Sequence, residues 1–389
     1  MSQKIEAIES LRGIGALMVL VDHLLCTFYP SMFFAGRKLH FGYEDAIRDS
    51  PVHLLYNGVF AVCLFFSLSG YVLSHKYFTT RDAETVRRSA YKRYFRLMVP
   101  VFAAVMISFL VGSFGLYHHM EIVAITGSLG WLDTLFQFPH GDIFGAIYSG
   151  LFGVFFSMDN RYNGALWTMN TELQGSFLIY GFLLFFGDRW ERIFAYIVGF
   201  LLFKDGYMIS FLAGMALCDL NTTLKYRVPE PICISITIVG LWIAAVPYDV
   251  NGLLSLIGLN IGAQYLNLIL GSILVLGGVA FSPFLNKLLS NSFMVWMGKL
   301  SFSVYVVHMI IIGSYSCITF SLLNQMVSYN VAAMATITSS IILVYLFATY
   351  FYRWFDLGGQ HLSKVLYETS YNQVSLVVKK TYTAILAWI

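Results

Sequence analysis

Charged residues are scarce in this sequence. Asp, Glu, Lys and Arg make up only 12% of the 389 residues, whereas 58% are hydrophobic and the mean hydropathy is +0.70. A soluble globular domain carries about 25% charged residues, and a single soluble core stops growing at about 250–300 residues. The composition therefore excludes an ordinary soluble domain and predicts a membrane protein. The net charge of +3 is too small to indicate a nucleic-acid partner.

Cysteine is scarce too, and its pattern does not favour a metal site or a disulfide framework. The five cysteines are Cys26, Cys63, Cys218, Cys233 and Cys317. They lie in or beside apolar stretches with no spacing typical of metal ligands, so we interpret them as small buried hydrophobic side chains.

Motifs of soluble catalytic folds are absent or incomplete. No P-loop or Rossmann signature occurs, and FSLSG at 66–70 lacks the first glycine of a nucleophile elbow. Gly70 is better explained by close helix packing. His40 and Asp45 form an HxxxxD pattern like that of glycerolipid acyltransferases, but short patterns arise by chance and this one lies in a predicted outside loop.

Long apolar runs fill the chain instead. Spanning the hydrocarbon layer takes roughly 20 predominantly apolar residues. By this criterion we expect about ten spans, at 12–30, 56–75, 97–116, 166–187, 193–204, 207–220, 232–247, 266–285, 302–323 and 330–352. The short fifth and sixth runs are either half-spans or one bent unit. The sequence predicts an all-α membrane protein, a helix bundle forming a single domain over residues 1–389.

The segment 117–165, between the third and fourth spans, is rich in glycine and aromatic residues. Non-helical backbone at membrane depth must line a cavity or be covered by protein. We therefore expect this segment to be a lumenal lid or a re-entrant element.

The loop between the second and third spans sets the expected orientation. It carries Lys76, Arg81, Arg87, Arg88, Lys92, Arg93 and Arg96. Short loops with this many positive charges stay in the cytoplasm. The N-terminus and, after ten spans, the C-terminus are then both expected to be cytoplasmic.

The first span carries the most informative ionisable residues, because charges inside a span are costly and mark functional sites by default. Arg12 and His23 are almost three helical turns apart, so they share one helix face at about 16 Å separation. Arg12 would lie at the cytoplasmic surface and His23, beside Asp22, near mid-membrane. An imidazole is the usual general base near neutral pH. The alternative is a histidine that only satisfies a helix–helix hydrogen bond.

Polar stripes mark two later spans. In the fourth span Glu172 lies on one face with Thr168 and Ser176. It would orient the His23 imidazole, as the third member of a triad does, or lie at the interface near the outer end of the span. The ninth span carries a stripe that either lines the same cavity or only joins helices. This stripe consists of Ser301, Tyr305 and His308.

Arg93 and Arg96 stand at i and i+3 at the foot of the third span, so they project together. Paired guanidinium groups suit bidentate phosphate binding, and coenzyme A carries a pyrophosphate and a ribose phosphate. The alternative is that the basic loop only sets topology.

Five segments together support one family resemblance. They are IESLRGIGALMVLVDHL at 8–24, FAVCLFFSLSGYVLSHKYF at 60–78, YKRYFRLMVP at 91–100, ALWTMNTELQGSF at 165–177 and LSFSVYVVH at 300–308. In order and spacing they resemble the acyltransferase-3 family of polytopic membrane acyltransferases, which modify carbohydrates and other hydroxylated molecules. The segment FFSLSG departs slightly from the family-typical FFVLSG.

The resemblance implies roles for particular residues. It implies an arginine and a histidine in the first span, here Arg12 and His23, and an RxxR pair, here Arg93 and Arg96. It also implies a tryptophan-to-glutamate element, here Trp167 and Glu172, and a late histidine, here His308. It also implies acetyl-CoA or another short acyl-CoA as co-substrate at the cytoplasmic face, rather than a tightly bound cofactor. The acceptor is often presented from the opposite side. We expect the form without the SGNH hydrolase-like domain that some relatives carry.

These observations predict a membrane-bound acyltransferase, most simply an O-acetyltransferase acting on a carbohydrate or glycolipid, in a bacterial cytoplasmic membrane. His23 would deprotonate the acceptor hydroxyl, and Glu172 would position or charge the histidine. The donor phosphates would be held by Arg12, Arg93 and Arg96. Further substrate contacts would come from Asp22, Trp167, Tyr305 and His308. The acceptor, the acyl chain length, the oligomeric state and the choice between direct and two-step transfer stay open.

Two rival functions fit less well. A flippase or transporter for a lipid-linked sugar would use the same polar groups as a path, but it predicts inverted repeats, and the sequence shows no convincing symmetry. A membrane-bound O-acyltransferase of the unrelated histidine–asparagine type would use His308 and Asn267. That assignment leaves Arg12 and His23 without a role.

Overall fold

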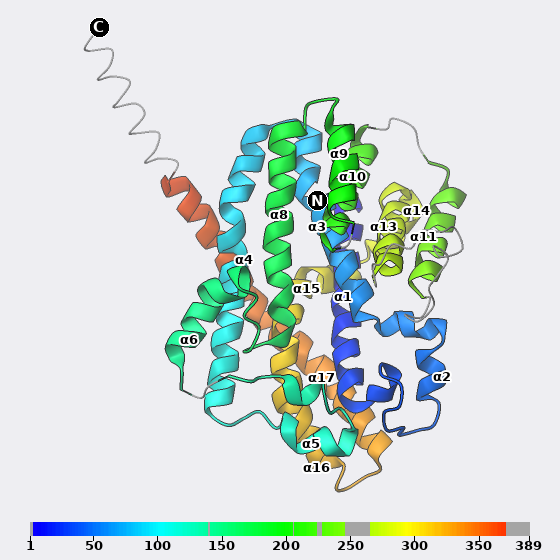
Figure 1. The fold of residues 1–389 in the computed structure, drawn as a ribbon, viewed down its shortest axis with the longest axis vertical. Coiled ribbons are helices and arrows are strands. Elements are labelled where there is room, and N and C mark those ends of the chain that lie inside the picture. The colour runs from blue at the N-terminus through cyan, green and yellow to red at the C-terminus, as the bar shows by residue number, and fades with distance from the viewer. Residues whose placement is uncertain (1–2, 139–140, 205, 224–227, 246–264, 371–389) are drawn as a thin grey trace, which may run out of the picture.

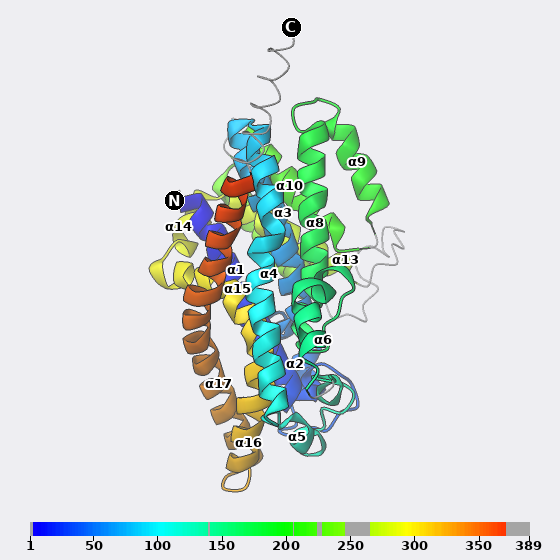
Figure 2. The ribbon, with the colours of Figure 1, turned by 90° about the vertical axis from the view of Figure 1, so that its left-hand side faces the viewer.

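The protein is a bundle of helices (Figures 1 and 2), and the described residues contain no β-strand. The computed structural model describes residues 3–138, 141–204, 206–223, 228–245 and 265–370. The longest helices are α1 (Gln3–Phe28), α3 (Gly58–Thr80), α4 (Ala83–Ser113), α8 (Trp167–Phe186), α15 (Ser292–Ile311) and α17 (Tyr329–Phe351). Shorter helices fill the periphery: α2 (Glu44–Arg48), α9 (Arg192–Leu202), α10 (Met208–Thr223), α11 (Glu230–Ala244), α13 (Leu266–Phe281), α14 (Pro283–Leu289) and α16 (Cys317–Leu323).

Within the described ranges, five helical segments are long and apolar enough to cross a membrane, or six if the bent pair α13–α14, at 98°, counts as one span. The structure thus confirms an all-α membrane protein but not the predicted number of ten spans. Each predicted range does contain a helix. However, α9 and α11 are only 11 and 15 residues long, and polar side chains in the first half of α8, such as Glu172 and Gln174, reduce its hydropathy.

The segment 117–165 is folded into short helices below α8 and beside the lower end of α4 (Figure 1). It comprises α5 (His119–Thr126), α6 (Ile143–Tyr148), α7 (Val154–Phe156) and intervening turns. Eight residues of the segment, from Trp131 to Ala165, line a cavity described below. The segment thus lines a cavity, one of the two arrangements open to non-helical backbone at membrane depth. Its assignment as a lumenal lid or a re-entrant element stays a prediction.

Glycine allows α3 and α10 to touch backbone to backbone. A Cβ atom added at Gly70 would lie 2.0 Å from the carbonyl oxygen of Phe211, and one at Gly214 would lie 1.9 Å from that of Ser67. Both positions therefore require glycine, as the packing interpretation of Gly70 predicted.

Replacing Gly70 with alanine is expected to force α3 and α10 apart and to destabilise the fold by about 1–3 kcal/mol. Thermal unfolding of the purified protein in detergent would measure the loss. The matched control is Gly181→Ala on α8, where an added Cβ meets nothing within 4 Å. Equal unfolding midpoints for the two variants would contradict the packing argument.

Candidate active site

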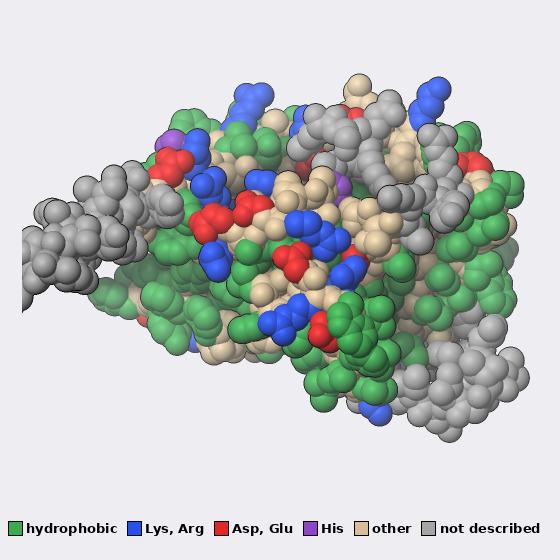
Figure 3. Space-filling model, turned by 90° about the horizontal axis from the view of Figure 1, so that it is seen from above, with side chains coloured by type: hydrophobic (Ala, Val, Ile, Leu, Met, Phe, Trp, Pro, Cys, Tyr) green, Lys and Arg blue, Asp and Glu red, His purple; other side chains and the backbone are tan. Residues whose placement is uncertain are grey.

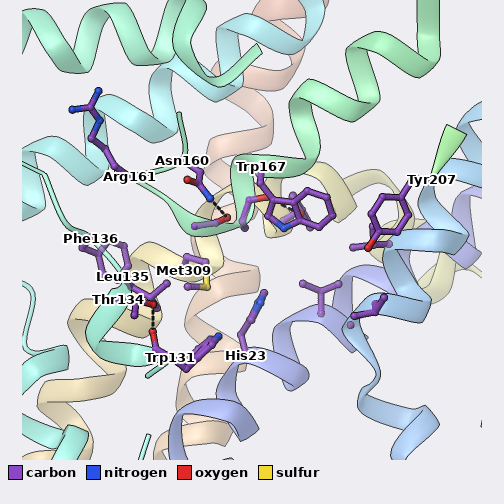
Figure 4. Close-up of a pocket in the computed structure, with 17 residues that line it drawn as sticks. His23, Trp131, Thr134, Leu135, Phe136, Asn160, Arg161, Trp167, Tyr207 and Met309 are labelled. Carbon is purple, nitrogen blue, oxygen red and sulfur yellow. Dashed lines mark hydrogen bonds between the residues drawn. The ribbon is translucent and has the colours of Figure 1, made fainter. Parts of the chain in front are cut away.

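His23, in the last two turns of α1, lines a cavity that we call the lower cavity, because α1 runs downwards in Figure 1. This lower cavity has a volume of about 340 Å³. Figure 4 shows His23 pointing into it between Trp131 and Trp167, with Met309 and Tyr207 farther along the wall. The side chain comes from α1. A polar residue is tolerated in this apolar helix because it faces a cavity instead of lipid.

His23 is hydrogen-bonded to His308 of α15, with 2.8 Å between Nδ1 of His23 and Nε2 of His308. The other nitrogen of His308, Nδ1, lies 2.7 Å from the carbonyl oxygen of Tyr305. A carbonyl only accepts, so His308 donates there from Nδ1. Neutral His308 then accepts at Nε2 from the Nδ1–H of His23. This fixes the tautomer of His23 and leaves its Nε2 as an unprotonated base.

Asp22 lies beside that base and also holds the start of α3. Its Oδ2 is 3.9 Å from Nε2 of His23, and its Oδ1 accepts a 2.9 Å hydrogen bond from the backbone N–H of Gly58. A Cβ at Gly58 would come within 2.8 Å of the carboxyl carbon. Asp22 is thus placed to stabilise a protonated imidazole, since a nearby carboxylate favours the charged form.

A second, middle cavity of about 130 Å³ lies above the first. It contains the charged residues Arg12, Arg93, Arg96, Glu172 and Asp356. These come from α1, α4, α8 and the π-helical segment Tyr352–Asp356 that continues α17. The structure therefore brings together all three arginines that the sequence predicted as donor-binding residues.

Glu172 lies in this middle cavity as the counter-ion of Arg93. Its Oε1 accepts from Nη2 of Arg93 and, at 2.8 Å, from the hydroxyl of Ser69. Ser69 also receives a 3.4 Å hydrogen bond from Arg12. The predicted contact of Glu172 with His23 is absent from the described contacts, because His308 occupies that position.

A third, upper cavity of about 530 Å³ lies between α3, α4 and the helical continuation of α17 that ends at Ser370. Arg93 and Arg96 line both the upper and the middle cavity, and Val62 and Tyr305 line both the middle and the lower one. The three cavities therefore follow one another from the basic end of the bundle to His23.

Tyr305 marks the boundary between the middle and lower cavities. Its hydroxyl lies 2.8 Å from the carbonyl oxygen of Ala165 and 2.8 Å from the hydroxyl of Thr168. The indole of Trp167 lines the lower cavity and packs on Tyr207, with 5.6 Å between ring centroids. Trp167 and Tyr305, which the sequence predicted as substrate contacts, thus both line the lower cavity.

Several site residues were not predicted from sequence. Ser69 belongs to the FSLSG segment, which lacks the first glycine of a nucleophile elbow, so no role was predicted for this serine. Trp131 lies 5.8 Å from His23, ring centroid to ring centroid, and comes from the irregular segment after α5. Its only signal was an aromatic residue among glycines at membrane depth. Tyr207 starts a span and resembled an ordinary interfacial tyrosine.

The HxxxxD pattern does not form a catalytic pair. The ring of His40 stacks on Tyr329 at 3.8 Å, and burial lowers the pKa of this imidazole. Asp45 instead binds Arg48 at 2.5 Å. All five cysteines are buried, as predicted. In the described part of the chain, no three His, Cys, Asp or Glu side chains gather as metal ligands would.

Residues 5–353 match the acyltransferase domain of the acyltransferase-3 family. The O-acetyltransferase PaAT-1 of Phomopsis amygdali is 25% identical over 429 residues, which cover 93% of this chain and 84% of that protein. No solved structure matches. The chain is therefore a multi-pass membrane acyltransferase and belongs to the acyltransferase-3 family.

Proposed function

We propose that the protein transfers an acyl group, most simply acetyl, from acyl-CoA at the cytoplasmic face to a hydroxyl group of a carbohydrate or glycolipid acceptor. The observation that carries the proposal is the row of three cavities, which leads from a basic opening past Arg93 and Arg96 to His23. A coenzyme A thioester has the matching form, with a polyanionic head and a narrow uncharged arm. The basic residues from Lys76 to Arg96, at the end of α3 and in the first half of α4, support the cytoplasmic assignment of that opening.

The chemistry needs one base at the meeting point of donor and acceptor. In the proposed mechanism, Nε2 of His23 takes the proton of the acceptor hydroxyl as its oxygen attacks the thioester carbonyl. The carbon–sulfur bond breaks, and the coenzyme A thiolate leaves and takes the proton from the imidazolium. His308 holds the tautomer throughout, and Asp22, 3.9 Å away, stabilises the charged intermediate state of the ring.

The acceptor would occupy the lower cavity. Its walls combine apolar residues with the indole and phenol rings of Trp131, Trp167 and Tyr207. Arg161 also lines the cavity, but its guanidinium is bonded to Asp159 at 2.8 and 3.0 Å. A cavity whose arginine is already neutralised suits an uncharged hydroxylated molecule. The envelope location of that acceptor, in a bacterial cell membrane, stays a prediction from sequence.

Purified protein in detergent or liposomes tests the proposal directly. We expect free coenzyme A to be released from acetyl-CoA only when a hydroxylated acceptor is present, as measured with a thiol reagent over a panel of sugars and glycolipids. Equilibrium binding of acetyl-CoA should be measured in the same preparation. Absence of acyl-CoA binding would reject the proposal and favour the transport function instead.

His308 is expected to act through His23. Replacing His308 with leucine should lower kcat about 100-fold or more, with the KM for acetyl-CoA unchanged, because the His23 tautomer is no longer fixed. His308→Gln should recover part of the rate, since its amide oxygen can accept from the Nδ1–H of His23. Equal kcat for the wild type and His308→Leu would exclude the positioning role.

A further inference from the structure

The upper cavity is lined by an unusually dense set of basic side chains. They are Lys76, Lys92, Arg93, Arg96, His361 and Lys364, and no described carboxylate joins them in the lining. Seen from above, Lys and Arg gather over the middle of the upper face, with some carboxylates among them and apolar side chains around them (Figure 3). At about 530 Å³ this cavity is larger than the middle and lower cavities.

These basic residues come from three distant parts of the chain. Lys76 belongs to α3, Lys92 to α4, and His361 and Lys364 to the helical continuation of α17. Setting topology requires positive charges near the membrane but does not require them to face one cavity. The convergence of all three segments on one space therefore needs a further explanation.

The continuation of α17 is held firmly against α4. The Tyr367 hydroxyl donates to Glu84 at 2.7 Å, and the Tyr91 and Ser370 hydroxyls lie 2.8 Å apart. The Tyr367 ring also lies 5.2 Å from the Lys92 ammonium. These contacts fix the wall that carries Lys364, so the cavity is pre-formed and its binding site needs little ordering.

The chemistry of the ligand follows from the shape and charge of the two adjoining cavities. The upper cavity offers several cationic donors, which suit a head carrying more than one phosphate. Among the described residues, Arg93 and Arg96 line both this cavity and the middle one, so the two cavities adjoin at these arginines. Beyond them the walls include apolar Phe65 and Leu97, which suit an uncharged arm. The ligand is therefore a polyanion with a slender neutral tail.

We propose that the upper cavity binds the nucleotide half of the acyl-CoA donor, with Lys76, Lys92 and Lys364 contacting its phosphates. This inference rests on the proposed function and adds the residues that distinguish coenzyme A from its pantetheine fragment. Arg12 lines the middle cavity and not the upper one, so we assign it to the pantetheine arm of the donor.

Lys364→Gln and the double variant Lys76→Gln/Lys364→Gln test the assignment. We expect the double variant to raise the KM for acetyl-CoA about tenfold with kcat unchanged, because two charge contacts are lost and both lysines are exposed, so that water screens each contact. Acetyl-pantetheine, which lacks the nucleotide, should show the same KM with wild type and variants. The matched control is Lys287→Gln, which removes an exposed charge on α14 outside the three cavities.

Direct binding separates failure of this inference from failure of the proposed function. Adenosine 3′,5′-bisphosphate should bind the wild type, bind the double variant about tenfold more weakly, and lose affinity as salt rises. Equal affinity of wild type and variant for this probe would overturn the inference, whether or not acyl transfer is observed. Phosphatidylglycerol tests the other source of phosphate: if the lysine variants weaken binding of this lipid but not of the nucleotide, the cavity is a lipid site.

Discussion

Replacing His23 with alanine is expected to lower kcat for acyl transfer about 100- to 10,000-fold, the range that a general base contributes. The imidazole is the cavity-facing end of a hydrogen-bonded series that runs from the Tyr305 carbonyl through His308. Without it, no described side chain occupies the position of Nε2 beside Asp22. Acetyl-CoA binding should change little, because the basic upper and middle cavities do not contain His23.

Initial rates with saturating acetyl-CoA and acceptor would measure the effect, together with equilibrium binding of acetyl-CoA. His118→Ala is the matched control, since it removes an imidazole that pairs with Glu121 at 2.8 Å and lines none of the three cavities. If His23→Ala turns over as fast as the control, His23 is not the base and His308 becomes the candidate.

The helical class could be predicted from sequence because lipid imposes a simple rule. Long apolar runs must become helices that satisfy their own backbone groups, and every predicted range does contain one. The number of spans could not be predicted in the same way. An apolar run can form a helix too short to cross a membrane, as α9 does with 11 residues, and a long helix can have a polar first half, as α8 does.

The pairing of Arg93 with Arg96 was predictable because its geometry is local. Arg93 and Arg96 are one turn apart on one helix, and helix geometry alone places them together. Arg12 of α1 lines the same cavity as these two arginines. Only the family resemblance indicated that the three arginines belong to one site.

Glu172 shows where sequence reasoning stopped. Trp167 begins α8 and lines the lower cavity with His23. Five residues of helix then raise Glu172 by about 7.5 Å towards the level of Arg12. The start of α8 is buried above the segment 117–165 instead of lying at an outer surface, and nothing in the periodicity of α8 reveals that depth. The pairing of His23 with His308 could not be predicted either, because the two residues are 285 positions apart in the sequence and lie on different helices.

The ion pair of Glu172 with Arg93 leads to the largest expected effect on stability. Both side chains are about nine-tenths buried, at 11% and 9% exposure. Replacing Glu172 with leucine is expected to lower the free energy of unfolding by about 3–5 kcal/mol, because it leaves a buried guanidinium without its counter-ion. Tryptophan fluorescence during denaturant titration in mixed micelles would measure the change. The control is Glu368→Ala, whose exposed pair with Lys364 should contribute about 1 kcal/mol or less.

The double variant Arg93→Leu/Glu172→Leu separates the cost of an unpaired charge from the cost of lost packing. We expect it to be more stable than Glu172→Leu alone, because removing both charges also removes the desolvation penalty of the remaining one. Neither variant should transfer acyl groups efficiently, since Arg93 lines both the upper and the middle cavity, where the donor is proposed to bind. If the double variant were instead less stable than the single one, Arg93 would be stabilised mainly by other partners. Its 2.7 Å hydrogen bond to Ser176 would then be the main contact that holds α4 against α8.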